Sequence, residues 1–232
     1  MPPPAREIEF KFAVHGKQAF DYLVNHLDLP SSVLENGVIQ TNHFFDSPGH
    51  CLHNHHFVIR LREENNRYSL TIKGEQQSPP DGGSVLSNRI EEEVVLPAES
   101  ARAMLDGSIT PRQVVKEHFS SRAASLLNMI EAACDQQALV HIGDFRNLRI
   151  HLPPVLLPAG NTSERVVFEL DSSTFPDGKV DYELEVEISE QSDAKSIETG
   201  LKELLRQAGI EWQTAPSKAE RFFAAISKRA VR

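Results

Sequence analysis

EIEFKF, residues 7–12, is the stretch of sequence that decides the fold. Successive side chains of an extended strand point to opposite faces, so Glu7, Glu9 and Lys11 share one face and the apolar residues between them share the other. A half-buried strand with its charges in water would show the same alternation. Whether these charges face water or an enclosed polar interior therefore depends on whether other strands repeat the pattern.

Several later segments do repeat this charged stripe, and the stripes carry both signs. Charges confined to one face of several strands favour a sheet curled around a polar interior over a sheet with a solvated outer face. For any single strand, a solvated face with salt bridges between strands remains the alternative. The repeated stripes are Arg60 and Arg62 in residues 58–62, then Arg89, Glu91 and Glu93 in residues 89–93, and Glu183, Glu185 and Glu187 in residues 183–187.

Hydrophobic periodicity and turn residues predict an α+β chain with roughly eight strands. Short connections between most strands favour an antiparallel sheet, which is large enough to close into an eight-stranded antiparallel β-barrel with flanking helices. We expect a single domain over residues 1–232, with a helical insertion at about 97–134 and C-terminal helices at about 192–229. Strands are expected at residues 7–12, 38–46, 57–62, 67–73, 89–96, 138–142, 144–152, 164–170 and 181–189, and helices at 17–27, 97–106, 110–133, 192–208 and 217–229.

Composition restricts the class of partner and the compartment. A net charge of -9 argues against nucleic acid, because non-specific binding to its backbone needs a surplus of Lys and Arg. No apolar run approaches the roughly 20 residues of a membrane span, and Met1–Pro4 lacks the basic start of a secretory signal. The two cysteines, Cys51 and Cys134, are too few for a disulfide framework and favour a reducing compartment. We expect a soluble, cytoplasmic protein.

If the stripes converge, the barrel interior holds a group of acids and a group of cations. Enclosed charges cost several kcal/mol each unless they are paired, so separate patches of both signs predict a ligand that also carries both signs. A polyphosphate with bound divalent cations fits, since Arg binds phosphate oxygens and hard cations bind carboxylates. An all-oxygen ligand set favours Mg²⁺ or Mn²⁺ over Zn²⁺. The acids are Glu7, Glu9, Glu183 and Glu185, and the cations are Lys11, Arg60, Arg62, Lys73, Arg89 and Arg146.

An ordered set of motifs over nearly the whole chain resembles the CYTH, or triphosphate tunnel metalloenzyme, superfamily. Its hallmark E-x-E-x-K motif near the N-terminus corresponds to Glu7, Glu9 and Lys11. The later motifs look most like the plant-type tripolyphosphatase branch. They are FFD (44–46), RLR (60–62), LTIKG (70–74), RIEEE (89–93), GDFRNLR (143–149), ELD (169–171), YELE (182–185) and Lys218.

The resemblance implies an eight-stranded tunnel that binds a triphosphate and usually hydrolyses it with a divalent metal. Whether Glu183 and Glu185 or Glu185 and Glu187 form the working pair is open. Arg146 and Arg149 differ in strand parity, and we expect Arg146 to point inward. The implied metal ligands are Glu7, Glu9, Glu183 and Glu185, with Asp171 as a further ligand or close neighbour, and the implied phosphate-binding residues are Lys11, Arg60, Arg62, Lys73, Arg89, Arg146 and Lys218.

The expected reaction is hydrolysis of inorganic triphosphate, or of a related triphosphate, by in-line attack of water on a terminal phosphorus with Mg²⁺ or Mn²⁺. Glu9 or Glu185 could accept the proton of the water, and the identity of the base is open. Lys11 is a poorer base because its neighbouring carboxylates favour the charged amine. The alternatives are a class IV type adenylate cyclase, a thiamine triphosphatase and a non-catalytic polyphosphate-binding module. The partner is a small-molecule triphosphate, and the protein is a monomer or homodimer.

The histidine-rich run at residues 50–56 also suggests a metal site. A zinc site needs four convergent ligands, and no second cluster accompanies this run. We therefore expect a polar turn there.

Overall fold

The structure of the chain is a computed structural model that describes residues 6–26, 36–76, 86–119, 124–135, 137–159, 162–188 and 192–230. The elements agree closely with the sequence-based expectation and add a short helix and a short strand. In chain order they are β1 (Arg6–Val14), α1 (Gly16–His26), β2 (Val38–Asp46), α3 (Cys51–Asn54), β3 (Val58–Glu64), β4 (Arg67–Gln76), β5 (Leu86–Leu96), α4 (Ala98–Leu105), α5 (Pro111–His118), α6 (Ala124–Cys134), β6 (Val140–His151), β7 (Val155–Ala159), β8 (Thr162–Thr174), β9 (Val180–Glu187), α7 (Ala194–Gln207) and α8 (Lys218–Ala230).

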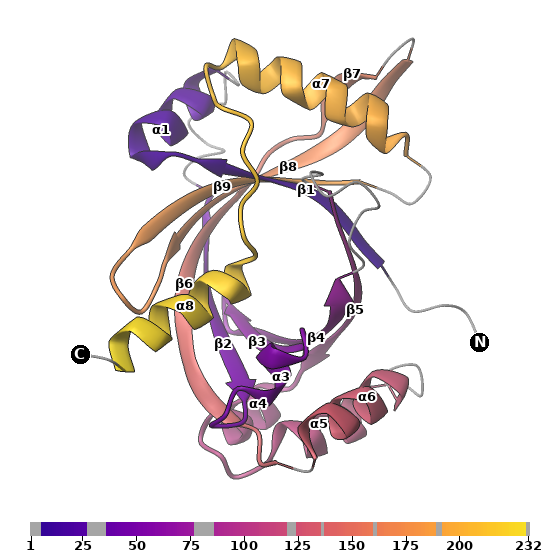
Figure 1. Cartoon of the computed structure of the whole chain (residues 1–232), viewed down its shortest axis with the longest axis vertical. Helices are drawn as coiled ribbons and strands as arrows, with labels where there is room; N and C mark the ends of the chain where they lie inside the picture. Colours follow the sequence, from indigo (N-terminus) through magenta and orange to yellow (C-terminus); the bar gives the residue numbers. More distant parts are fainter. Residues whose placement is uncertain are drawn as a thin grey trace.

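Eight of the strands form a closed ring of antiparallel pairs. The order around the ring is β6-β2-β3-β4-β5-β1-β9-β8, and the last strand pairs back with β6. Strand β8 is long enough to serve two partners on one edge: Glu169–Thr174 pair with β6, and Thr162–Val166 pair with β7. Figure 1 looks through this ring. The eight-stranded antiparallel barrel predicted from the sequence is confirmed.

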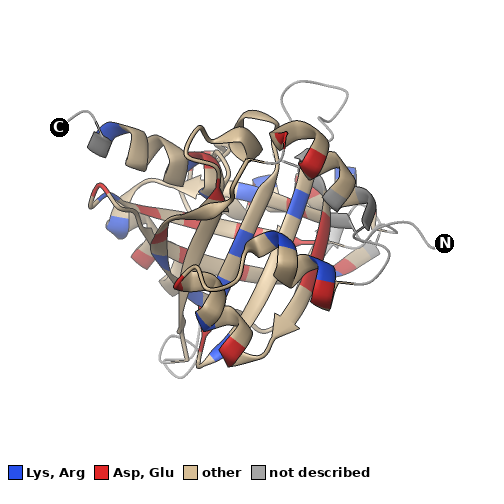
Figure 2. Cartoon of the chain, turned by 90° about the horizontal axis from the view of Figure 1, so that it is seen from below, with Lys and Arg blue, Asp and Glu red and all other residues tan. Residues whose placement is uncertain are grey.

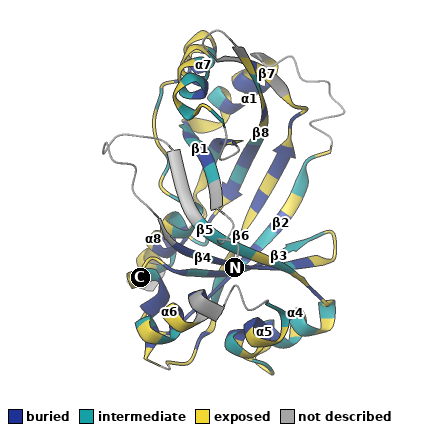
Figure 3. Ribbon diagram, turned by 90° about the vertical axis from the view of Figure 1, so that its right-hand side faces the viewer, coloured by how far each residue is buried: buried dark blue, intermediate teal, exposed yellow. Residues whose placement is uncertain are grey.

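The barrel is hydrophobic on its outer face, where the helices cover it. On one side, Phe10 and Phe12 of β1 pack beneath α1 and α7, together with apolar residues of β8 and β9. On the opposite side, Leu61 of β3 and Leu70 of β4 pack against α4, α5 and α6. Figures 1 and 3 show these two helical layers at opposite ends of the molecule. Because the apolar parity of β1, β3, β4, β8 and β9 faces these helices, the charged parity of those strands faces the interior.

A third apolar cluster lies beside the ring, where α8 crosses it. Phe222 of α8 stacks on Phe44 of β2, with ring centroids 4.5 Å apart, and Phe145 and Phe175 complete the cluster. This packing holds the first residues of α8 close to the interior, which becomes important for Lys218.

Two expected element boundaries were wrong for local reasons. The helix expected at residues 110–133 is two helices, of which α5 begins with a capping box between Thr110 and Gln113. The strands expected at 138–142 and 144–152 form one strand, β6, with a register shift opposite Phe44 and Phe45. At this bulge Gly143 has φ +138°, and a side chain there would come within 3.2 Å of Phe222. Glycine meets both demands.

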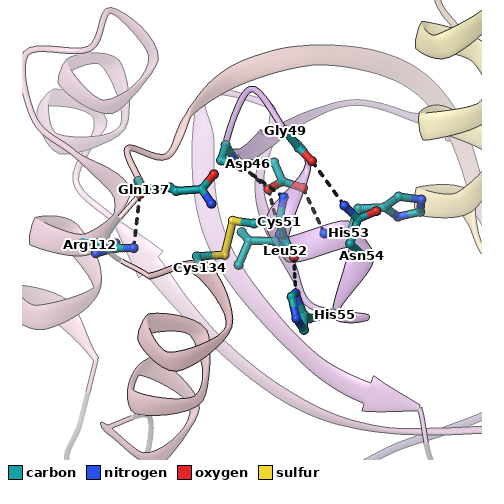
Figure 4. Close-up of a disulfide and its surroundings, with 11 residues drawn as sticks. Asp46, Gly49, Cys51, Leu52, His53, Asn54, His55, Arg112, Cys134 and Gln137 are labelled. Atoms are coloured by element: carbon teal, nitrogen blue, oxygen red, sulfur yellow. Dashed lines mark hydrogen bonds between the residues drawn. A yellow bond between two sulfur atoms is a disulfide. The ribbon is translucent and has the colours of Figure 1, made fainter.

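Cys51 and Cys134 form a disulfide between α3 and α6, which weighs against the reducing compartment that the number of cysteines favoured. The two lie 83 positions apart in the sequence, so spacing alone does not pair them. Asp46 brings Cys51 into place, since its carboxylate accepts hydrogen bonds from the backbone N–H groups of Leu52 and His53 at the start of α3 (Figure 4). Within the described ranges, no helix is both long and apolar enough to cross a bilayer.

Candidate active site

The inward faces of the barrel strands enclose a cavity of about 460 Å³. Strands from both halves of the chain contribute to it, and Figure 2 shows their acidic and basic bands on neighbouring strands. The first residues of α8 close part of its rim. The charged lining residues are Glu9, Lys11, Arg60, Arg62, Lys73, Glu91, Glu93, Arg149, Glu169, Glu185, Glu187 and Lys218.

On its acidic side the cavity is lined by Glu169 of β8 and Glu185 of β9, which belong to a cross-strand cluster of carboxylates. Asp171 of β8 is directly opposite Glu183 of β9, and Glu185 follows two residues later on the same face. All three are buried, with exposed fractions of 0%, 1% and 4%. One oxygen from each carboxylate lies within 4.8 Å of the other two, a spacing at which the three could hold one metal ion. We call Asp171, Glu183 and Glu185, together with Glu9 and Glu169, the acidic wall.

Lys218, the first residue of α8, neutralises the centre of the acidic wall. Its Nζ lies 2.7–2.8 Å from carboxylate oxygens of Asp171, Glu183 and Glu185. Burial alone would lower the pKa of Lys218, but these three carboxylates outweigh it and raise the pKa to about 12. The helix start is fixed by a reciprocal cap, because Ser217 N–H donates to the Glu220 carboxylate and Glu220 N–H donates to the Ser217 hydroxyl.

Lys11 of β1 connects the N-terminal strand to this wall. Its Nζ is 2.7 Å from Glu9 and 3.0 Å from Glu185, its partner across the β1–β9 pair. Burial opposes the charged form of Glu185, but Lys11, Lys218 and Arg149 hold its pKa well below the usual range. Acids from the first and last strands of the barrel thus meet in one network.

Arg149 of β6, like Lys218, pairs with three carboxylates of the wall. Its guanidinium donates two hydrogen bonds to Asp171, at 2.9 Å and 2.6 Å, and contacts Glu169 and Glu185 as well. Burial disfavours its charge, yet these carboxylates raise its pKa well above the usual value. For Glu169 burial is the largest influence, and it raises the pKa of that carboxyl group despite Arg149.

The basic wall consists of Arg60 and Arg62 on β3 and Lys73 on β4. Lys73 lies 2.8 Å from Glu91, and Arg60 donates a 3.2 Å hydrogen bond to Thr71 and is 3.9 Å from Glu91. Arg62 donates one long hydrogen bond, 3.4 Å, to Asn42, and no carboxylate of the described residues lies within ion-pair distance of it. Burial, Arg60 and Arg149 lower the pKa of Arg62 to about 10.

The structure shows which of the remaining sequence-predicted residues face the cavity. The expectation that Arg146 points inward was wrong: Arg146 is exposed, and Arg149 occupies the interior because β6 turns Phe145, Asn147 and Arg149 toward the cavity. Glu187 is exposed at the cavity rim, whereas Glu183 and Glu185 lie in the buried cluster.

Two predicted site residues have side chains outside the described part of the structure. The backbones of Glu7 and Arg89 pair across β1 and β5. The geometry of the site is therefore given by the residues of the acidic and basic walls, whose side chains are described.

Sequence reasoning missed three contributors. Glu169 contacts Arg149, and Arg221 of α8 donates a 2.7 Å hydrogen bond to Glu183. Asn147 donates a 2.7 Å hydrogen bond to Asp171. A signal for Glu169 was present, since it shares the strand parity of Asp171; Arg221 lies on a helix, where strand parity gives no information.

The residues of the acidic wall fit a hard divalent cation. The donor set is entirely carboxylate oxygen, which is the chemistry that Mg²⁺ and Mn²⁺ prefer. In addition, the Glu183 Oε1 atom is buried and meets no hydrogen-bond partner among the described residues. A buried carboxylate oxygen without a partner is costly unless something binds it.

Comparison with known proteins places this chain in a family. Residues 5–223 match the CYTH domain. The chain belongs to the CYTH domain family. YjbK of Bacillus subtilis (strain 168), which is named a triphosphatase, is 26% identical to this CYTH protein over 217 residues, 94% of each chain.

Two solved structures share the fold of this CYTH protein. HpAC1 from Hippeastrum, described as an adenylyl cyclase with a dominant triphosphatase activity, superimposes with a TM-score of 0.73 at 22% identity over 94% of this chain and 95% of its own. A Bacillus halodurans protein described as an adenylate cyclase gives a TM-score of 0.66 at 23% identity over 94% and 97%. At these identities the likeness establishes the barrel architecture.

Proposed function

We propose that this CYTH protein is a divalent-metal-dependent triphosphatase that hydrolyses inorganic triphosphate or a related triphosphate. The observation that carries the proposal is the separation of charge within one cavity: a cluster of buried carboxylates on β8 and β9, and the cations Arg60, Arg62 and Lys73 on β3 and β4. Arg62 carries the most weight, because it is partly buried in the cavity wall and no carboxylate of the described residues lies within ion-pair distance of it. The triphosphatase names of YjbK and HpAC1 support the same activity.

Asp171, Glu183 and Glu185, with Glu9 beside Lys11, would hold Mg²⁺ or Mn²⁺. When bound, such a cation supplies charge to bridging phosphate oxygens and lowers the pKa of a coordinated water. Arg60, Arg62 and Lys73 orient the phosphate chain and stabilise the charge that develops on the transferring phosphoryl group. The lowered pKa of Glu185 makes that carboxylate a weak proton acceptor, and the general base is Glu9 or Glu185.

The cations of the acidic wall also have a part in binding. Lys11, Arg149 and Lys218 each contact at least two of its carboxylates. With these oxygens bound to a metal ion, the ammonium groups of Lys11 and Lys218 and the guanidinium group of Arg149 would be available to phosphate oxygens. Metal and triphosphate should therefore bind more tightly together than separately.

The proposal includes a cytoplasmic location, a monomer or homodimer, and no nucleic-acid partner. The net charge of -9 supports the last point. The Cys51–Cys134 disulfide is the observation that opposes a reducing compartment.

A substrate panel tests the activity. We expect phosphate release from tripolyphosphate with Mg²⁺ or Mn²⁺, little release with a chelator, and slower turnover of ATP and thiamine triphosphate. Glu9→Gln should abolish turnover without unfolding the protein, and Arg146→Ala, on the exposed face of β6, should match the wild type. Cyclic AMP and pyrophosphate from ATP would instead identify a cyclase, and tight triphosphate binding without products would identify a binding module.

A further inference from the structure

The outer face of the β2–β6 pair carries a cluster of polar side chains that the tunnel does not use. Asn42 and Phe44 of β2 face the cavity, so His43 between them faces outward. Asp144 of β6 is directly opposite His43. On this face His43 is largely covered, with 12% of its side chain exposed, whereas His141 and Asp144 are exposed.

The bulge in β6 brings His141 to the same place. In a regular strand, residues three positions apart point to opposite faces, which would separate His141 from Asp144. The register shift next to Gly143 removes this separation, since Phe45 pairs with His141 while His43 pairs with Asp144. One ligand atom from each of His43, His141 and Asp144 consequently lies within 4.8 Å of the other two.

The two imidazoles are spaced as ligands of one metal ion. His43 Nδ1 and His141 Nε2 are 3.2 Å apart. Two nitrogens bound to one tetrahedral zinc, each about 2.0–2.1 Å from the ion, lie about 3.3 Å from each other. An imidazole–imidazole hydrogen bond has a similar length. The distance alone therefore does not distinguish a metal site from a hydrogen-bonded pair, and the surroundings of His43 are needed to do so.

Those surroundings provide the support that a metal-bound histidine usually has. A ligating imidazole commonly donates its second N–H to a carboxylate. The other nitrogen of His43, Nε2, is buried, meets no hydrogen-bond partner among the described residues, and points toward Glu63 at 4.0 Å. Glu63 is itself held by a 3.0 Å hydrogen bond from the Tyr68 hydroxyl. A small movement of Glu63 completes this arrangement.

We propose that His43, His141 and Asp144 form a Zn²⁺ site on the outer face of the barrel, with Glu63 orienting His43. Three protein ligands of mixed nitrogen and oxygen type leave the fourth tetrahedral position to water or another ligand. The nitrogen ligands distinguish this site from the all-carboxylate acidic wall, which suits Mg²⁺ or Mn²⁺. The ion would join β2 to β6, the pair that connects the N-terminal and C-terminal strands of the ring. The site stands independently of the proposed triphosphatase activity.

The test is a Zn²⁺ titration of the full chain against a chromophoric chelator, in a large excess of Mg²⁺ so that the tunnel carboxylates do not bind zinc. We expect one Zn²⁺ per chain. His141→Ala and Asp144→Asn alter exposed side chains and should fold normally, yet each should weaken Zn²⁺ binding by more than about tenfold, and Glu63→Gln by about tenfold to a hundredfold. His43→Gln should do the same as His141→Ala, with circular dichroism to verify its fold.

Two control variants keep the assignment specific. His15→Ala removes an exposed histidine that contacts Gln213, and a His53→Ala/His56→Ala double variant removes part of the histidine-rich run; both should bind Zn²⁺ like the wild type. The proposal is overturned if no Zn²⁺ binds, which would leave His43 and His141 as a plain hydrogen-bonded pair. It is equally overturned if binding survives in His43→Gln and His141→Ala or disappears in the double variant.

Discussion

Arg149 and Arg62 line the same cavity, but their charged partners differ and their pKa values shift in opposite directions. Arg149 contacts three carboxylates of the acidic wall, and its pKa is raised well above the usual value. Arg62, on the basic wall, donates one long hydrogen bond to an amide, and its pKa is lowered to about 10. The strands that carry them are separated in the ring by β2 alone, since β2 pairs with β6 on one side and with β3 on the other.

This difference in pairing distinguishes two roles of charged residues in an enclosed site, which are stabilising the fold and binding a ligand. A fully paired buried cation contributes to the fold, because its removal leaves carboxylates without compensation. A buried cation without a carboxylate partner costs folding free energy, and natural proteins retain such groups where a ligand offsets the cost. We therefore infer that Arg149 stabilises the fold by neutralising the acidic wall, and that Arg62 binds an anionic ligand.

Removal of Arg149 should have the largest effect. In Arg149→Met, Asp171 and Glu185 lose a buried partner, and we expect the free energy of unfolding to fall by about 3–5 kcal/mol. Urea denaturation measures this loss. The matched change on the exposed face of the same strand, Arg146→Met, should alter the free energy of unfolding by less than about 0.5 kcal/mol. Equal losses in both variants would mean that the ion pairs of Arg149 contribute nothing to stability.

The helical layer behind the basic wall offers a second contrast. The Cys51–Cys134 disulfide joins α3 to α6 and closes a long loop, with the cysteines 83 positions apart. Cys51→Ser should therefore lower the free energy of unfolding by about 2–5 kcal/mol. Native-state hydrogen exchange should accelerate more in β3 and β4, whose outer faces pack on this layer, than in β8 and β9. Uniform acceleration in both pairs of strands would contradict this division.

Removal of Arg62 should affect binding and leave the fold intact. In Arg62→Met a partly buried cation without a carboxylate partner among the described residues becomes apolar, so the free energy of unfolding should stay constant or rise. Loss of a charge-assisted contact worth about 1.5–3 kcal/mol should lower kcat/KM for tripolyphosphate about tenfold to a hundredfold. Steady-state kinetics and urea denaturation of the same preparation measure both quantities. A destabilised Arg62→Met with normal kinetics would reverse the roles assigned to the two arginines.

The strand pattern was enough to predict the barrel and most of its charged lining. Alternation in β1, β3 and β9 is regular, so Glu9, Arg60 and Glu185 could be assigned to the interior from parity. In β6, strand parity could not decide whether Arg146 or Arg149 faces the cavity. Both faces of this strand mix charged and apolar residues, and a bulge shifts its register.

Contacts made by the tertiary fold were beyond prediction. The pairing of Cys51 with Cys134 depends on how α3 and α6 pack, and the contact of Arg221 with Glu183 depends on how α8 crosses the ring. Local sequence carries information on neither. The register of β6 against β8, which sets Arg149 directly opposite Asp171, is likewise a property of barrel closure.

The acidic wall should also determine how stability responds to acid, which we expect to be the smallest of these effects. The pKa values of Asp171 and Glu185 are lowered in the folded state, so their contribution is present above the pKa of the unfolded carboxyl groups and is lost as pH falls. The raised pKa of Glu169 has the opposite sign: it favours the folded state at low pH and loses that contribution as pH rises. Urea denaturation between about pH 5 and pH 3 should therefore show a smaller loss of stability in Glu185→Gln than in the wild type, and a larger loss in Glu169→Gln. If both substitutions change the pH dependence in the same direction, burial does not dominate at Glu169 or the neighbouring cations do not dominate at Glu185.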